Sequence, residues 1–413
     1  MPEDLLADPQ HLAGLSKAME EIANDGYRIV ALTREHCLVS AAGFGGEVFQ
    51  PLLQPFTLAA EATSNRLSGI SGTNLSTSTE LNNAAWLYHE RDKQTYEALN
   101  AATIDMHTGQ PVAVDSSFEN PGVVKDYYAS IWYGKPNIIK TDPPSAAPPE
   151  LADLISETTG VLGDVNDAIK DVTRMAGEEI NILETVLNPI TVNWNELRRI
   201  GETYKVAGNG MEALGANLED GLSKVGPNWN GQAAIAFENW ARTQIAAMKW
   251  EGPTGRVICD LFNVISDRIR ECIRTACEKL KDMIVSMVEF RSVKDVLKFV
   301  AKKIPVIGTI AEAIDLSTKI WKVVDMVLDI KREIEHLRDR ITELLQFVTD
   351  PVGKGKEWVQ QKMEPVTGAV ADAAKKAALV NDINSIAHAE DTLNRPKNSY
   401  EIGSGQQPWQ AAT

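Results

Sequence analysis

Residues 211–240 read MEALGANLEDGLSKVGPNWNGQAAIAFENW, and this stretch decides the fold. Apolar side chains recur near every 3.6 residues up to Leu222, which indicates an amphipathic helix. Gly226-Pro227 ends that helix, and the periodic pattern restarts at Ile235, so we expect two long helices joined by a tight turn. The turn contains Trp229-Asn230-Gly231, whose tryptophan can cover the hairpin end and whose glycine lets the backbone turn sharply.

The first hundred residues predict another helical hairpin. Asp8 and Pro9 form a helix start, with an N-cap residue followed by proline at the first helical position. Apolar residues then follow at helical spacing, and the glycine-rich stretch 42–46 separates two helices, which should form an antiparallel pair. Residues 68–79 are rich in Ser, Thr, Gly and Asn, so we expect the second helix to be locally weak there.

Composition separates four regions, and we divide the third of them, the strongly helical residues 151–350, into two further parts. The resulting five parts are a helical hairpin at 1–102, a proline-rich connector at 103–150, a longer helical hairpin at 151–290, a helical extension at 291–350 and a weakly structured tail at 351–413. The predicted fold class is therefore all-α. We expect an elongated antiparallel helical bundle of two hairpins, with additional C-terminal helices and a flexible tail.

Two local features qualify this scheme. Residues 251–253 read Glu-Gly-Pro, which predicts a break or kink in the second hairpin. From Ile320 to Val348 apolar residues alternate three and four apart, as in a coiled-coil seam. This seam indicates a helix that packs on another helix of the same chain, with an oligomer seam as the alternative reading.

Composition and motifs exclude several classes of function. The 413 residues hold 41 Lys+Arg against 57 Asp+Glu, a net charge of −16, so nucleic acid is an unexpected partner. The N-terminus lacks the basic and apolar segments of a Sec signal peptide, and no apolar run is long enough to span a membrane. The most apolar segment, 304–316, predicts a buried core helix, with an interfacial helix as the alternative.

No enzyme signature is present, and no histidine pair has the spacing of a helical metal site. We therefore expect a non-enzymatic protein without a cofactor or a bound metal. The four cysteines form no C-x-x-C pair, and buried free thiols are the expectation for them.

Two short motifs remain. Tyr88 and Asp92 lie four residues apart near the predicted end of a helix, so an aromatic ring and a carboxylate share one side of it. The sequence Tyr88-x-x-x-Asp92 resembles the Y-x-x-x-D/E export signal of type VII (ESX) secretion substrates. Trp229-Asn230-Gly231 resembles the W-x-G turn of the WXG superfamily, to which those substrates belong.

The resemblance covers roughly the first 290 residues. Residues 1–102 resemble the small EspC-type hairpin proteins, and residues 151–290 resemble a longer WXG or PPE-like hairpin, in an EspB-like arrangement. It implies that Tyr88, Asp92, Trp229 and Gly231 meet at one tip of a four-helix bundle and form a composite export signal. It also implies recognition by the type VII secretion ATPase or a chaperone, and a secreted or cell-surface location after folding in the cytoplasm.

Two other functions stay open. In the first alternative, the amino-terminal part is the delivery module of a secreted toxin or effector. In the second, the seam and the apolar segment 304–316 drive a homo-oligomeric, membrane-acting structural assembly.

Overall fold

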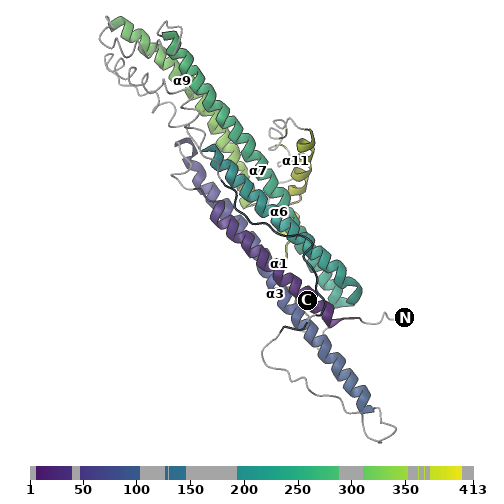
Figure 1. The fold of residues 1–413 in the computed structure, drawn as a ribbon. Helices are drawn as coiled ribbons and strands as arrows, with labels where there is room; N and C mark the ends of the chain where they lie inside the picture. The colour runs from purple at the N-terminus through teal and green to yellow at the C-terminus, as the bar shows by residue number, and fades with distance from the viewer. Residues whose placement is uncertain are drawn as a thin grey trace.

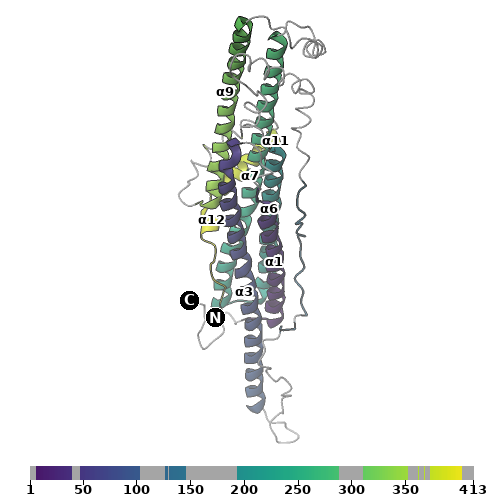
Figure 2. The same ribbon diagram turned by 90° about the vertical axis from the view of Figure 1, so that its left-hand side faces the viewer.

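We analysed a computed structural model of the chain, and the fold it describes is an elongated bundle of α-helices (Figures 1 and 2). The described residues are 6–39, 47–102, 126–128, 130–145, 193–287, 310–351, 361, 367 and 373–401. Within them the chain is helical apart from connecting segments and one isolated β-bridge, which confirms the predicted all-α class.

The first hairpin consists of α1 (Pro9–His36), the short 3-10 helix η1 (Glu47–Leu52) and α3 (Leu53–Ala102). Its start is as predicted, because the Asp8 side chain caps α1 by accepting a hydrogen bond of 2.8 Å from the backbone N–H of Gln10. The helices α1 and α3 run side by side along the bundle. The predicted glycine loop at 42–46 lies outside the described residues.

The helix α3 continues without a break through the polar stretch where we expected weakness. Its hydroxyl groups bond within the helix, as when Ser71 donates to the carbonyl of Leu67 at 2.9 Å. Its polar face is buried against α7, where the fully buried amide of Gln244 donates to the carbonyl of Ile70 and to the Thr73 hydroxyl, each at 2.9 Å. Tertiary hydrogen bonds of this kind outweigh the low intrinsic propensity of the stretch.

The second hairpin consists of α6 (Trp194–Val225), the 3-10 turn η4 (Gly226–Asn228) and α7 (Gln232–Met287). The end of α6 before Gly226 was predicted, but the expected break at 251–253 is wrong. Instead α7 continues as one helix through Pro253, close to its contact with α6. A side-chain carbon at Gly208 would collide with the backbone carbonyl of Glu251, so glycine permits this approach of the two backbones.

The helix α9 (Ile310–Thr349) extends the bundle beyond the two hairpins and packs on α3 and α7. The described side chains of the seam belong to or pack against the same core cluster as Phe262 and Ile269 of α7, with Leu337 partly buried at its edge and the others buried. The buried seam residues are Ile330, Ile334, Ile341, Leu344 and Val348. This half of the seam therefore packs within the chain, while the side chains of the earlier seam residues Ile320, Val323 and Val327 are not among those that the structure describes.

The tail is more ordered than expected at 373–401. Here α11 (Ala373–Ile386) and the single turn α12 (Glu390–Leu393) pack against α7. The guanidinium of Arg256 forms a paired contact with the Asp382 carboxylate at 2.8 and 2.9 Å, and the Trp250 indole donates to the carbonyl of Ile386 at 3.2 Å. A bidentate ion pair and a buried indole hydrogen bond fix α11 to the bundle.

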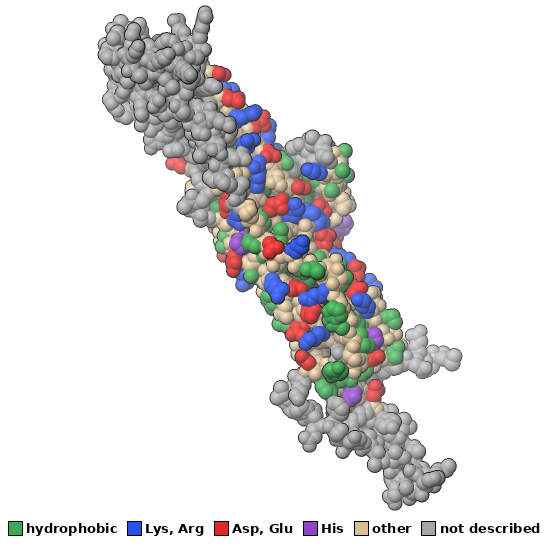
Figure 3. Space-filling model, viewed as in Figure 1, with side chains coloured by type: hydrophobic (Ala, Val, Ile, Leu, Met, Phe, Trp, Pro, Cys, Tyr) green, Lys and Arg blue, Asp and Glu red, His purple; other side chains and the backbone are tan. Residues whose placement is uncertain are grey.

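The surface mixes charges of both signs along the upper and middle parts of the face in Figure 3, and hydrophobic side chains gather toward the lower end, where α1 begins. Exposed apolar side chains include Tyr128 (82%), Trp132 (72%) and Ile138 (85%) of the connector. None of the described helices is long and apolar enough to cross a membrane. All four cysteines are buried free thiols, as expected.

Candidate recognition site at the bundle tip

One end of the bundle, which we call the tip, joins the start of α1 to the turn between α6 and α7. The backbone N–H of Asp8 donates to the carbonyl of Asn228 at 3.0 Å, and that of Asn230 donates to the carbonyl of Leu6 at 2.9 Å. The side chain of Asn230 accepts from the backbone N–H of Leu6 at 2.7 Å. These bonds flank the isolated antiparallel bridge between Ala7 and Trp229, so the two hairpins are tied together at the predicted W-x-G turn.

The W-x-G turn has the geometry that its residues predict. Gly231 has φ of 89°, a left-handed conformation that side-chain-bearing residues rarely adopt, and α7 starts directly after it. Trp229 turns inward and is 3% exposed, with its ring 5.4 Å from that of Phe237. The tryptophan therefore fills the end of the core.

Tyr88 reaches the same place from the other hairpin. It is 4% exposed and belongs to the same hydrophobic cluster as Trp229 and Phe237. Burial raises the pKa of Tyr88, and the nearby indole N–H of Trp229 offsets part of that rise. The contact falls short of a full hydrogen bond, because the indole N–H of Trp229 has no well-aligned acceptor among the described residues. The two predicted motifs are thus brought together.

Asp92 lies one turn beyond Tyr88 and is exposed. The motif does not end the helix, as we had expected, because α3 continues to Ala102 and projects past the tip (Figure 2). Burial makes the largest contribution to the raised pKa of Tyr127, and the negative charges of Asp8 and Asp92 raise it further. Tyr127, Asp8 and Asp92 therefore lie near one another at one rim of the tip. Asp92 therefore offers an accessible negative charge beside the buried aromatic residues.

The connector closes this rim of the tip. The hydroxyl of Tyr127 lies 3.1 Å from Nδ1 of His89, and its ring meets that of Trp86 edge-on at 4.9 Å. The backbone N–H of Tyr127 donates to the side chain of Asn82 at 2.8 Å. Part of the predicted connector is therefore packed, and it sits beside the Tyr88–Asp92 motif on the same helix.

Sequence reasoning missed Tyr400, which is also part of the tip. Its ring meets those of Trp229 and Phe237 edge-on at 6.2 and 5.3 Å, and its hydroxyl donates to the carbonyl of Ala233 at 2.9 Å. The residue is 3% exposed. The sequence signal was a single tyrosine in a weakly patterned tail, and such a residue does not indicate which other residues it contacts.

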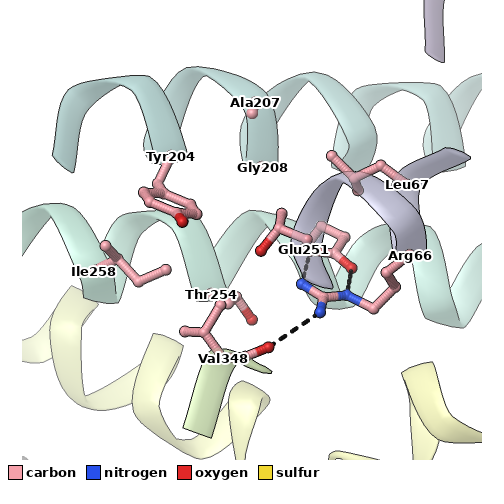
Figure 4. A pocket seen from close by; sticks show the side chains of 11 residues that line it. Arg66, Leu67, Tyr204, Ala207, Gly208, Glu251, Thr254, Ile258 and Val348 are labelled. Carbon is pink, nitrogen blue, oxygen red and sulfur yellow. Dashed lines mark hydrogen bonds and ion pairs between the residues drawn. The ribbon is translucent and has the colours of Figure 1, made fainter. Parts of the chain in front are cut away.

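A buried charge pair lies farther along the bundle and was also missed. Arg66 of α3 makes a bidentate contact with Glu251 of α7, and it donates to the carbonyl of Val348 at 3.2 Å (Figure 4). The two charged side chains are 8% and 3% exposed. The adjoining cavity of about 10 Å³ has room for roughly one water molecule, which suits the unpaired hydroxyls of Thr63 and Tyr204 on its wall. It is too small for a substrate.

No described group of three or more His, Cys, Asp or Glu side chains could hold a metal ion. Comparison with known proteins found no matching family model, no matching curated protein and no matching solved structure. The choice of the tip as the candidate site therefore rests on its geometry alone. It places the exposed carboxylate of Asp92 next to a cluster of buried aromatic rings.

Proposed function

We propose that this chain is a non-enzymatic substrate of a type VII (ESX) secretion system, and that the tip is its export signal. Asp92 supplies the charge of the signal, Tyr88 and Trp229 supply its aromatic part, and Gly231 shapes the turn. The partner is the secretion ATPase or a chaperone that delivers the chain to it. On this account the protein folds in the cytoplasm and is then exported to the cell surface or beyond.

One observation carries the proposal: Tyr88 and Trp229 come from separate hairpins and lie in one cluster at the same end of the bundle. A composite signal requires that its two motifs lie at one place, and this arrangement provides that. The backbone bonds between Leu6 and Asn230 hold this end of the molecule in one conformation, which a recognition surface requires.

A partner that fits the tip would bring a basic group to Asp92 and apolar surface to the neighbouring rings. A charge-assisted hydrogen bond to the carboxylate would give direction, and burial of the aromatic rings would give most of the affinity. Because the carboxylate and the aromatic rings contribute differently to binding, we expect both Asp92 and the aromatic residues to be needed for export.

The proposal is tested by measuring the exported fraction of variants in a bacterium with an active type VII system. Tyr88→Leu keeps an apolar side chain in the core but removes the ring from the tip. Tyr204→Leu is the matched control, since Tyr204 is equally buried but lies in the other core cluster. We expect Tyr88→Leu to remain soluble in the cell and to lose export, whereas Tyr204→Leu is exported. Equal export of both variants would contradict the proposal.

A further inference from the structure

Residues 394–400, which we call the strap, run in an extended path from α12 down to the tip (Figure 2). The strap has neither helical nor strand structure, so it is attached by individual bonds. The backbone N–H of Tyr400 donates to the hydroxyl of Thr77 on α3 at 2.9 Å. On the other side, the indole of Trp240 on α7 donates to the carbonyl of Asn398 at 3.1 Å. The strap therefore bridges α3 and α7.

The strap ends on the aromatic part of the tip. Tyr400 packs edge-on against the rings of Trp229 and Phe237. Burial raises the pKa of the Tyr400 hydroxyl, and the nearby hydroxyl of Tyr88 raises it further. With Tyr400 in place, Tyr88 and Trp229 are 4% and 3% exposed. A partner can reach Asp92 in this state but cannot contact the aromatic rings.

The middle of the strap is held weakly. Arg395 is half-buried on α3, and its guanidinium lies 3.2 Å from the position that a side-chain carbon at Gly69 would take. The backbone N–H of Arg395 donates to the carbonyl of Thr392 at 3.4 Å, but its guanidinium makes no hydrogen bond or ion pair with the described side chains. Burial and then the neighbouring charge of Arg66 lower the pKa of Arg395, and the negative charge of Glu251 offsets only part of this effect. The contrast is Arg256, whose guanidinium pairs with Asp382 and anchors α11. An unpaired, partly desolvated cation opposes docking of the strap.

We infer that the strap is a displaceable cover over the tip, and that the secretion partner reaches Tyr88 and Trp229 only after Tyr400 has left. The inference rests on the proposed function, since it concerns access to the same site. The partner first meets the exposed Asp92, and its contacts with the uncovered rings then favour the open state. Such a partner shifts the population because it binds the open state more tightly than the covered state.

Chymotrypsin provides a direct measurement of opening. It cleaves after tyrosine and phenylalanine, and it can take residue 400 into its pocket only when the strap has left the core. Cleavage after the exposed Tyr128 serves as the internal control for protease activity. Tyr400→Phe removes the hydrogen bond to Ala233 and should raise the cleavage rate after position 400 roughly fivefold, the effect of one neutral hydrogen bond.

Arg395→Met tests the opposite direction. Loss of the unpaired charge should tighten the strap and lower the cleavage rate at position 400 by about threefold. The matched control is Lys376→Met, which removes an exposed charge from α11 and should leave the rate unchanged. In the secretion assay, export should rise with Tyr400→Phe, fall with Arg395→Met and stay at the wild-type level with Lys376→Met.

Two results would overturn the inference. Equal cleavage at position 400 in the wild type, Tyr400→Phe and Arg395→Met would show that these contacts do not hold the strap. Altered cleavage with unaltered export would show that opening does not control export. Neither result bears on Asp92, so failure of the strap and failure of the proposed function remain distinguishable.

Discussion

The ring of Tyr88 on α3 and the indole of Trp229 in the α6–α7 turn lie against each other at the tip, although they belong to different hairpins. Each has lost nearly all contact with water. The pair therefore joins the hairpins as part of the hydrophobic core, while Asp92 one turn away carries the accessible charge. Replacement of Asp92 therefore tests recognition without disturbing the core, whereas replacement of Trp229 also changes stability.

Truncation of the buried tryptophan should destabilise the protein strongly. Trp229→Ala removes a side chain that fills the end of the core, and we expect a loss of about 3–5 kcal/mol in the free energy of unfolding. Trp132→Ala is the control, since that side chain is 72% exposed and should change the free energy by less than about 0.5 kcal/mol. Urea denaturation monitored by circular dichroism measures both. Similar losses for the two variants would contradict the described burial.

The close crossing of α6 and α7 should not tolerate a methyl group. Gly208→Ala brings its side chain into the backbone carbonyl of Glu251, and we expect a loss of about 1–3 kcal/mol as the helices shift apart. Gly226→Ala is the control, because nothing lies within 4 Å of the added carbon. Thermal unfolding of both variants checks the prediction, and a stable Gly208→Ala variant would show that the helices do not approach this closely.

The buried charge pair should be costly to break and cheap to replace as a whole. Glu251→Gln leaves the Arg66 guanidinium buried without a counter-charge, so we expect a loss of about 3–5 kcal/mol. The double variant Arg66→Met/Glu251→Leu removes both charges and should recover most of that loss, because the desolvation cost of both ions disappears. Chemical denaturation of the two variants measures the difference. A double variant that is less stable than Glu251→Gln would contradict this reading of the pair.

Alkaline pH should weaken the fold. Burial raises the pKa of Cys259 to about 12 and those of Cys272 and Cys277 to about 11, from the ordinary 9.0. The unfolded chain therefore loses these protons first. The stabilisation is fully present below pH 9.0 and is lost as pH rises toward 12. The urea midpoint should be lower at about pH 11 than at neutral pH, and the loss should be smaller in Cys259→Ala. A midpoint that does not change with pH would refute this.

Helical periodicity was sufficient to predict the long helices α1, α3, α6 and α7 and the turn at Gly226, because the apolar stripes on these helices become the core. It failed at Pro253 and in the polar stretch of α3. At Pro253 the fit between α6 and α7 keeps the helix intact, and in α3 buried hydrogen bonds such as that from Gln244 to Thr73 do the same. Neither effect is local, so neither leaves a signal in the sequence near the residue concerned.

The candidate site was predicted only in part. The meeting of Tyr88 with Trp229 was expected from the resemblance of two short motifs, and spacing alone would not have indicated it. The packing of Tyr400 and of Arg66 with Glu251 was not expected, because each contact joins segments far apart in the chain. A lone tyrosine or a single charged residue in a helix carries no information about such a partner.

The central claim is that the tip is an export signal, and Asp92 tests it most directly because the residue is exposed and its replacement leaves the core intact. The measurement is the exported fraction of Asp92→Asn against Glu90→Gln, which removes the same charge from an exposed position on the same helix. The account predicts that Asp92→Asn accumulates as soluble protein in the cell, with export reduced at least about tenfold, the effect of losing one charge-assisted contact of roughly 1.5–3 kcal/mol. It predicts wild-type export for Glu90→Gln. Undiminished export of Asp92→Asn would contradict the account.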